Sequence, residues 1–374
     1  MRILYILTTL GIGGAEKQVI ALAERMAARG HSVALVALKH AEEEWPVKLP
    51  VLRLNIAKTP IGIFRGLRFA TKFLSLFHPD ILHSHTFPAN VFARLLCMMS
   101  RRSGIVPAVV NTIHNVHEGG WHRMLIYRMT SAFADRVTAV SAAAAERFVL
   151  LRAVPAKKMS VLTNGIDTEA FAPDRNRRKR MRAQMETGDA FVWLAVGRLV
   201  PAKDYPNMLQ AFAVVRMTHP NALLWIVGEG DISSLVLRDL EAAQDVLGES
   251  SPVQLLGLRR DIVELLDAAD GYVLSSAWEG MPLALGEAMA MEKPVVATDV
   301  GGVREVVGER GFVVPAKDSD ALANAMLAVM AMGEKERRAM GREARQRMRL
   351  SFSMNEKVDE WDAFYAQLMK VESA

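Results

Sequence analysis

The stretch Gly271-Tyr-Val-Leu-Ser-Ser-Ala-Trp-Glu-Gly-Met-Pro-Leu-Ala-Leu-Gly-Glu287 joins an apolar run to a helical pattern through a short loop. The run Gly271–Ser276 predicts a buried strand. Pro282 predicts the first turn of a helix, because its fixed φ suits that position. Ligands of α/β proteins bind at the carboxyl ends of parallel strands. The carboxylates of Glu279 and Glu287 therefore mark a candidate site.

The same alternation of apolar runs and helical patterns continues along nearly the whole chain of 374 residues. It predicts an α/β fold of two doubly wound halves, each with a parallel sheet covered by helices on both faces. A turn signal at Asn164-Gly165-Ile166-Asp167 separates the halves, so we expect domains at residues 1–166 and 167–353. A last helical pattern, Met354–Met369, has an apolar face that must pack on a neighbour. The predicted strands are Ile3–Thr8, Ser32–Lys39, Val51–Ile56, Asp80–His85, Ala108–His114, Arg136–Ser141, Ser160–Thr163, Phe191–Gly197, Ala222–Val227, Val253–Gly257, Gly271–Ser276, Pro294–Thr298 and Gly311–Val314.

The composition excludes several classes of protein. A single cysteine, Cys97, excludes an internal disulfide framework and fits a reducing, cytoplasmic compartment. No apolar run reaches the roughly 18 to 20 residues of a membrane span. The net charge of +5 suits anionic small ligands or an anionic membrane surface. No RNA-binding motif of aromatic and basic residues is present, so we expect no nucleic acid partner. The dense basic run Arg175–Arg182 is predicted to be a solvated helix face.

Two loops contain residue types that suit a phosphate. Arg198 and Lys203 flank a turn after the first predicted strand of the second half, where two cations can hold a diphosphate. The loop Thr9–Glu16 places Gly13 and Gly14 before the first helix, where backbone N–H groups can receive an anion. These glycines do not match the dinucleotide fingerprint. By itself this loop fits a bare tight turn equally well.

The two carboxylates of the opening stretch resemble a glycosidase pair only at first sight. Glu287 lies about one and a half turns into the predicted helix, whereas Glu279 lies on the loop before it. The two side chains are therefore expected to touch different parts of one elongated ligand. Carboxylates accept hydrogen bonds from hydroxyl groups, so sugar diols are natural targets. The helix start at Met281–Leu283 can receive a phosphate.

Together these motifs resemble those of the retaining glycosyltransferases of family 4. The resemblance implies the GT-B fold, in which two Rossmann-like domains face a central cleft and the C-terminal helix, residues 354–374, crosses back to the N-terminal domain. It also implies a nucleotide-sugar donor and a reaction without a metal or other cofactor. The matching segments are Gly13-Gly-Ala-Glu16, His83-Ser-His85, Asn111-Thr-Ile-His114, Asn164-Gly-Ile-Asp167, Gly197-Arg-Leu199 with Lys203, Gly228-Glu-Gly230, Glu279-Gly-Met-Pro282, Glu287-Ala-Met289, Pro294-Val-Val-Ala-Thr298 and Gly301-Gly302.

The resemblance assigns donor-binding roles in both halves. Arg198 and Lys203 would hold the donor diphosphate, and Glu287 would hold the ribose hydroxyls. Glu279 and the backbone that follows it would hold the donor sugar and the distal phosphate, and Arg259 would lie beside the base. The implied donor-binding residues are Gly13, Gly14, Arg198, Lys203, Arg259, Glu279, Gly280, Met281, Pro282, Leu283 and Glu287.

The resemblance also indicates which residues surround the transferred sugar. The implied catalytic residues are Glu279, His114, Arg198 and Lys203, and the implied acceptor-binding residues are His85, His114 and Asn115. From their position alone, His83 and His85 end a predicted strand, so a structural role fits them as well as an acceptor contact does. No residue stands out as a nucleophile.

Three segments, Ile56–Pro60, His83–Asn90 and His114–Gly120, resemble enzymes that extend lipid-linked oligosaccharides. We therefore expect a retaining hexosyltransferase that moves a hexose or N-acetylhexosamine from a nucleotide sugar, UDP-linked by family habit. The expected acceptor is a glycan such as a polyprenyl-diphosphate-linked saccharide at the inner face of the cytoplasmic membrane. The alternatives are a sugar-nucleotide 2-epimerase with the same fold and a non-enzymatic sugar-nucleotide-binding regulator.

The segment Ile61–Phe77 bears on membrane binding because it has helical spacing with two stripes. The basic stripe is Arg65, Arg68 and Lys72, and the aromatic stripe is Phe69, Phe73 and Phe77. Such a helix either covers the sheet as part of the core or lies on an anionic membrane, and the two roles can coexist. Trp121–Met124 adds an aromatic and basic loop in the same half.

Overall fold

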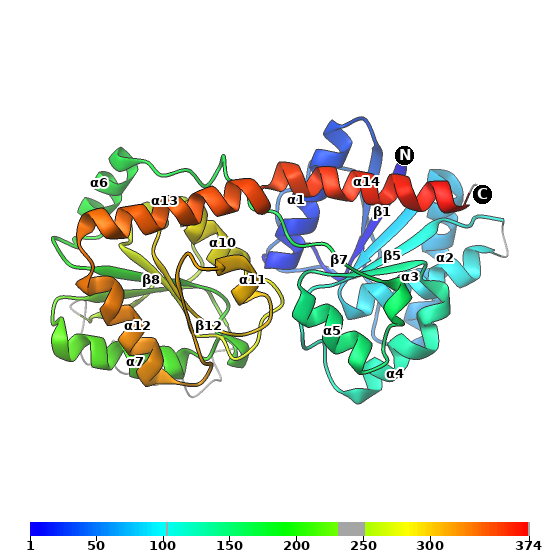
Figure 1. Ribbon diagram of the computed structural model, residues 1–374. Helices are drawn as coiled ribbons and strands as arrows, with labels where there is room; N and C mark the ends of the chain where they lie inside the picture. The colour runs from blue at the N-terminus through cyan, green and yellow to red at the C-terminus, as the bar shows by residue number, and fades with distance from the viewer. Residues whose placement is uncertain (102–103, 231–250, 373–374) are drawn as a thin grey trace. The chain divides into compact units, whose positions relative to one another are not determined.

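The computed structural model describes residues 1–101, 104–230 and 251–372. The chain divides into two compact units (Figure 1). Unit 1 consists of Met1–Gly165 and Met354–Ala374, and unit 2 consists of Ile166–Ser353. Each unit has a parallel sheet with helices on both sides, so the prediction of two doubly wound α/β domains is confirmed.

The sheet of unit 1 has the strand order β3-β2-β1-β4-β5-β6-β7, with parallel pairing throughout. Its strands are β1 (Arg2–Leu7), β2 (Ser32–Ala37), β3 (Val51–Arg53), β4 (Ile81–His85), β5 (Ala108–Ile113), β6 (Arg136–Ala139) and β7 (Met159–Val161). Its helices are α1 (Gly14–Ala28), α2 (Pro60–Phe77), α3 (Phe87–Ser100), α4 (Trp121–Thr130), α5 (Ala142–Leu150) and α14 (Met354–Glu372).

Side chains of unit 1 alternate between two hydrophobic cores, as the strand period requires. Leu4 and Ile6 pack with α2, α3 and α5 on one face of the sheet. Ile3 and Tyr5 pack with α1 and α14 on the other face. Trp361 of α14 belongs to this second core. The prediction that the C-terminal helix packs on the N-terminal domain is therefore confirmed.

The sheet of unit 2 has the order β10-β9-β8-β11-β12-β13, again with parallel pairing. Its strands are β8 (Val192–Val196), β9 (Leu223–Val227), β10 (Val253–Leu255), β11 (Gly271–Leu274), β12 (Val295–Thr298) and β13 (Phe312–Val314). Its helices are α6 (Arg175–Gln184), α7 (Tyr205–Thr218), α9 (Ile262–Ala268), α10 (Leu283–Ala290), α11 (Val303–Val307), α12 (Ser319–Ala331) and α13 (Glu334–Ser351). Each predicted strand of either half overlaps one of these strands.

Both sheets reverse their strand order beside the first strand of the unit. β1 lies between β2 and β4, and β8 lies between β9 and β11. At such a switch point the two connections leave toward opposite faces, and the carboxyl ends of the strands stay open to a ligand. The sequence motifs follow β1, β4, β8 and β11. The glycine loop comes after β1, the histidines lie at the end of β4, the two cations come after β8 and the loop to Glu279 comes after β11.

The basic run forms α6, and the prediction of a solvated helix face is wrong for Arg177, Arg178 and Arg182. Arg177 Nε donates to Asp267 Oδ2 at 2.6 Å. Arg178 Nη1 donates to the carbonyl oxygens of Asp267, Ala268 and Ala269 at 2.8 to 2.9 Å. These carbonyls end α9, where backbone acceptors lack partners within the helix. The exposed cations of the run are Arg175, Lys179 and Arg180, so half of its six cations are solvated as expected.

The helix α2 covers the sheet with one side and is exposed on the other. Leu67, Ala70 and Leu74 are buried against the sheet. On the opposite side, apolar side chains are exposed among the basic residues. They are Ile61 at 68%, Phe64 at 56%, Phe69 at 57% and Leu76 at 71% relative exposure. In the described part of the chain, no helix is long and apolar enough to cross a bilayer.

We predict that Arg178→Ala lowers the free energy of unfolding of unit 2 by roughly 1–3 kcal/mol, because carbonyls at the end of α9 lose a charged donor. The measurement is thermal denaturation followed by circular dichroism. Lys179→Ala is the matched control, since Lys179 is exposed on the same helix. Equal melting temperatures for the two variants would contradict a structural role for Arg178.

Candidate functional site

The switch point of unit 2 collects the predicted donor residues at the ends of two neighbouring strands. Arg198 follows β8, and Lys203 ends a short 3-10 turn, Pro201–Lys203. Glu279 lies in the loop after β11, and Glu287 lies in the second turn of α10. Pro282 precedes α10 by one residue, so it lies one position earlier than predicted.

Lys203 and Glu279 form an ion pair. Lys203 Nζ lies 2.5 Å from Glu279 Oε1, and the side chains are only 19% and 12% exposed. Ser276 Oγ donates to the same carboxylate oxygen at 2.7 Å. Among residues 1–101, 104–230 and 251–372, Glu279 Oε2 has no hydrogen-bond partner. The carboxylate is therefore held through one oxygen, and the other can accept from a ligand hydroxyl.

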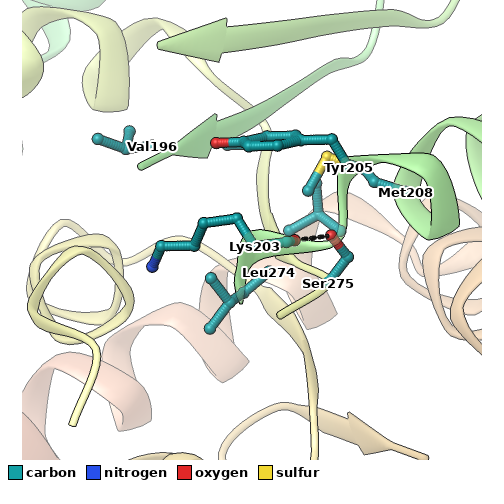
Figure 2. Close-up of a pocket in the computed structure, with 8 residues that line it drawn as sticks. Val196, Lys203, Tyr205, Met208, Leu274 and Ser275 are labelled. Atoms are coloured by element: carbon teal, nitrogen blue, oxygen red, sulfur yellow. Dashed lines mark hydrogen bonds between the residues drawn. The ribbon is translucent and has the colours of Figure 1, made fainter. Parts of the chain in front are cut away.

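Glu287 is 7% exposed and shares its surroundings with Glu279. Burial raises the pKa of the Tyr272 phenol well above its usual value, and the charges of Glu279 and Glu287 raise it further. Tyr205 is a second buried phenol near the site, and its hydroxyl donates to the carbonyl of Gly197 at 2.8 Å. Tyr205 and Lys203 line a narrow pocket with Ser275 (Figure 2).

The two arginines of the predicted site differ in their surroundings. Arg198 is exposed, and within the described segments its side chain makes no hydrogen bond or ion pair. Arg259 Nε donates to Asp261 Oδ1 at 2.8 Å. This hydrogen bond lowers the pKa of the Asp261 carboxyl. Arg259 is thus held by a neighbour, and its predicted place beside a base stays a prediction.

Glycines determine the shape of the loop around Glu279. Gly301 has φ +55°, and a Cβ there would lie 2.1 Å from the carbonyl oxygen of Glu279. The N–H of Gly302 donates to the carbonyl of Gly280 at 2.7 Å. The Gly301-Gly302 pair therefore supports the backbone that leads into Met281, Pro282 and Leu283 at the start of α10. This arrangement explains why the sequence needs a glycine at position 301.

The glycine loop of unit 1 carries an acidic side chain at the helix start. Gly13 precedes α1, and Gly14 is its first residue. Thr9 Oγ1 donates to Glu16 Oε1 at 3.1 Å. The other oxygen, Glu16 Oε2, would lie 2.3 Å from a Cβ on Gly13. The Glu16 carboxylate thus covers part of the backbone that the resemblance assigns to the phosphates.

A chain of histidines follows the carboxyl ends of β4 and β5. His85 Nδ1 lies 3.0 Å from His114 Nε2, and the ring centroids of His83 and His85 are 4.0 Å apart. His83 bonds to Thr112 and, through Nδ1, to the hydroxyl of Tyr365 in α14 at 2.6 Å. His83 therefore has a structural role. His85 is 3% exposed and touches the half-buried His114, which has an accessible edge.

Burial keeps these imidazoles neutral. It lowers the pKa of His114 to about 4 and lowers the pKa of His83 and His85 well below 6.5. One hydrogen is therefore shared between His85 Nδ1 and His114 Nε2. His85 Nε2 is buried, and in the part of the chain that the structure describes it has no hydrogen-bond partner. His114 can thus act as a neutral hydrogen-bonding group at neutral pH.

Sequence reasoning missed Glu118, which is 9% exposed and contacts this site. Its Oε1 accepts from the backbone N–H of His114 at 3.2 Å, and its Oε2 accepts from the Tyr127 hydroxyl at 2.7 Å. Asn115 Oδ1 accepts from the N–H of His117 at 3.0 Å, which shapes the same loop. A lone glutamate in a polar loop carries no periodic signal that marks it as buried.

Two family models match the chain in the regions that hold these groups. The model described as Glycosyltransferase Family 4 matches residues 12–170, and the model described as Glycosyl transferases group 1 matches residues 190–332. The chain belongs to glycosyltransferase family 4. This family membership confirms the expectation that the chain is an enzyme, a glycosyltransferase.

The chain is also similar to individual relatives and to a solved structure. The UDP-Gal:alpha-D-GlcNAc-diphosphoundecaprenol alpha-1,3-galactosyltransferase of Escherichia coli is 28% identical over 86% of this chain and 83% of the relative. The GDP-mannose-dependent alpha-(1-6)-phosphatidylinositol monomannoside mannosyltransferase of Mycolicibacterium smegmatis is 32% identical over 64% of this chain and 65% of that protein. Anabaena HepE in complex with UDP and glucose has a TM-score of 0.84 at 22% identity, covering 98% of this chain and 100% of that one. This last likeness shows the fold alone.

We predict that the stability of this family 4 glycosyltransferase decreases as pH rises through the titration of Glu118. Burial raises the pKa of Glu118 from 4.5 to about 7. The native state therefore binds a proton that the unfolded state has lost between these values, so folding is favoured at the acidic end. The full effect is on the order of 3 kcal/mol above pH 7.

The test compares melting temperatures of the wild type and Glu118→Gln from pH 5 to pH 8. If the amide of Glu118→Gln lowers the melting temperature by the same amount at every pH, that loss does not affect how the difference between the two proteins changes with pH. The difference between the two proteins should shift by a few degrees in favour of the variant as pH rises. Parallel curves would show that Glu118 does not titrate in this range.

Proposed function

We propose that this chain is a retaining, metal-independent glycosyltransferase that moves a hexose or N-acetylhexosamine from a UDP-sugar to a polyprenyl-diphosphate-linked saccharide. The observation that carries the proposal is the ion pair of Lys203 with Glu279 at the switch point of β8 and β11, beside Glu287. It places a cation for a diphosphate and carboxylates for sugar hydroxyls at one sheet edge. The family supports the reaction class, and the E. coli relative supports the donor and acceptor.

In this proposal the protein acts mainly on the leaving group. The bond between the sugar's anomeric carbon and the diphosphate oxygen breaks, and its electron pair goes to the diphosphate. Lys203 and Arg198 stabilise the charge that grows there. Lys203 has three N–H donors, so it can bind a phosphate oxygen while it keeps its contact with Glu279. Glu287 accepts hydrogen bonds from the ribose hydroxyls.

Hydrogen bonds also hold the donor sugar. Glu279 Oε2 accepts from a hydroxyl of the donor sugar, while Oε1 stays bonded to Lys203 and Ser276. His114 binds a sugar hydroxyl as a neutral imidazole, held by His85. The acceptor oxygen attacks from the face that the diphosphate leaves, and its proton goes to a diphosphate oxygen. Configuration is then retained without a protein nucleophile.

The donor base is proposed from the relatives. The E. coli relative is named for UDP-galactose and aligns with most of this chain, whereas the mycobacterial relative is named for GDP-mannose and aligns with less of it. A panel of UDP- and GDP-hexoses in a thermal-shift assay decides between them, since a bound ligand raises the melting temperature by mass action. An epimerase would convert the sugar nucleotide without any acceptor, so product analysis without acceptor distinguishes that alternative.

We predict that Lys203→Ala and Glu287→Ala each lower sugar transfer at least about tenfold, because each removes roughly 1.4 kcal/mol or more of transition-state stabilisation. The measurement is the initial rate of transfer from the UDP-sugar selected by the panel to a polyprenyl-diphosphate-linked saccharide. Lys179→Ala, an exposed lysine of α6, is the control and should keep the wild-type rate. Wild-type rates in both site variants would refute the donor site.

We also propose that unit 1 binds an anionic membrane surface through α2. Its exposed apolar side chains lie among the exposed cations Arg65, Arg68 and Lys72, which is the pattern of an interfacial helix. On α4, Trp121 is 78% exposed and Met129 is 72% exposed. Helices α2 and α4 both pack against α3. A lipid-linked acceptor would meet the enzyme at such a surface.

We predict that the triple variant Arg65→Glu, Arg68→Glu, Lys72→Glu loses most of its binding to vesicles that contain anionic phosphatidylglycerol. Each cation near such a surface contributes about 1 kcal/mol. Vesicle co-sedimentation measures the loss. The control variant Arg175→Glu, Lys179→Glu, Arg180→Glu makes the same charge change at exposed positions of α6. Equal binding of both variants would remove α2 from the proposal.

A further inference from the structure

Two adjacent serines follow β11, and the side chain of each reaches a different part of the donor site. Ser275 and Ser276 are both 0% exposed. The strand ends at Leu274, so neither side chain is fixed by the alternation of the sheet. A buried hydroxyl requires a hydrogen-bond partner. The partners of these two hydroxyls lie in the two segments that carry the ion pair of Lys203 with Glu279.

Ser276 acts on the carboxylate. Its Oγ donates to Glu279 Oε1 at 2.7 Å, and Lys203 Nζ approaches the same oxygen at 2.5 Å. The serine is itself held from β12, because Thr298 Oγ1 donates to the Ser276 carbonyl at 2.6 Å. Two donors on one oxygen fix the rotation of the carboxylate. The direction in which Glu279 Oε2 presents its lone pairs is therefore set by Ser276 and Lys203 together.

Ser275 acts on the backbone that carries the cation. Its Oγ lies 2.8 Å from the carbonyl oxygen of Lys203 (Figure 2). It also lies 2.9 Å from the carbonyl oxygen of Asp204, so one hydrogen is shared by two acceptors. Asp204 has φ +46°, a left-handed conformation that residues other than glycine adopt rarely. The N–H of Ala277 also donates to the carbonyl of Ala202 at 2.8 Å. The end of β11 thus holds the turn from which Lys203 extends.

We propose that Ser275 and Ser276 are positioning residues of the donor site with separate targets. Ser275 places the ammonium group of Lys203 for the diphosphate, and Ser276 places the carboxylate of Glu279 for the sugar. The inference rests on the proposed function, because it takes the diphosphate as the ligand of Lys203 and the sugar as the ligand of Glu279. It adds two residues that have no charge and need not touch the donor.

The separate targets predict separate losses of affinity, which calorimetry can measure with UDP and with UDP-galactose. Ser276→Ala should raise the Kd of UDP-galactose by about tenfold and leave the Kd of UDP within about twofold, because UDP lacks the sugar. Ser275→Ala should raise both values, by about three- to tenfold, because both ligands carry the diphosphate. GDP and GDP-mannose replace this pair if the wild type prefers them.

Several controls separate positioning from loss of structure. Ser100→Ala removes another fully buried serine hydroxyl, in α3 of unit 1, and should change neither Kd. Ser275→Cys and Ser276→Cys keep the side-chain size and weaken the hydrogen bond, and they replace the alanine variants if those do not fold. Ser276→Thr keeps the hydroxyl and should restore the wild-type ratio of the two Kd values.

The proposal is overturned if Ser276→Ala weakens both ligands equally or neither, or if Ser275→Ala leaves the Kd of UDP unchanged. The donor site itself is judged separately by Lys203→Ala and Glu287→Ala. If those two lose transfer while the serine variants bind as the wild type does, only the positioning roles fail. If those two keep wild-type transfer, the proposed function fails first.

Discussion

Parallel strands whose order reverses leave their carboxyl ends open, and this constraint places most candidate functional groups of the protein. In unit 2 the reversal lies between β8 and β11, and it brings Lys203 next to Glu279 although the two are 76 positions apart in the chain. In unit 1 it lies between β1 and β4, and β5 follows on the same side with His114 beside His85. Such contacts follow from topology, because no local sequence pattern joins residues so far apart.

The ion pair of Lys203 with Glu279 is better explained by ligand binding than by stability. Removing two charges from water costs several kcal/mol per ion, so a buried pair often adds little to folding. Arg177 with Asp267 is a contrasting case, because that arginine belongs to a cluster that also binds the last carbonyls of α9. Both pairs are short and partly buried. Only the first lies at a strand end where a ligand could compete for its donors.

The sequence predicted the parts of the structure that depend on local pattern. Apolar runs located each strand that the structure describes, and the loops after β8 and β11 were predicted to form a site because cations and carboxylates follow strands there. The roles of Arg178, Glu118 and Ser276 could not be predicted from the sequence, since each depends on a partner supplied by another element. The basic run of α6 shows the reason most clearly. Charge density alone cannot tell a solvated arginine from one that binds the end of a distant helix.

The position of α14 at the end of the chain has a consequence for biosynthesis. The helix α14 contributes Trp361 and Tyr365 to a core whose buried members outside this helix lie between Ile3 and Val110, yet it is translated after the whole of unit 2. Unit 2 is therefore synthesised completely while one face of the sheet of unit 1 still lacks part of its cover and His83 still lacks its Tyr365 partner. Domains usually fold in the order of their synthesis. In this enzyme the first domain to emerge is the last to be finished, and nascent chains that stop early expose an apolar sheet to chaperones and proteases.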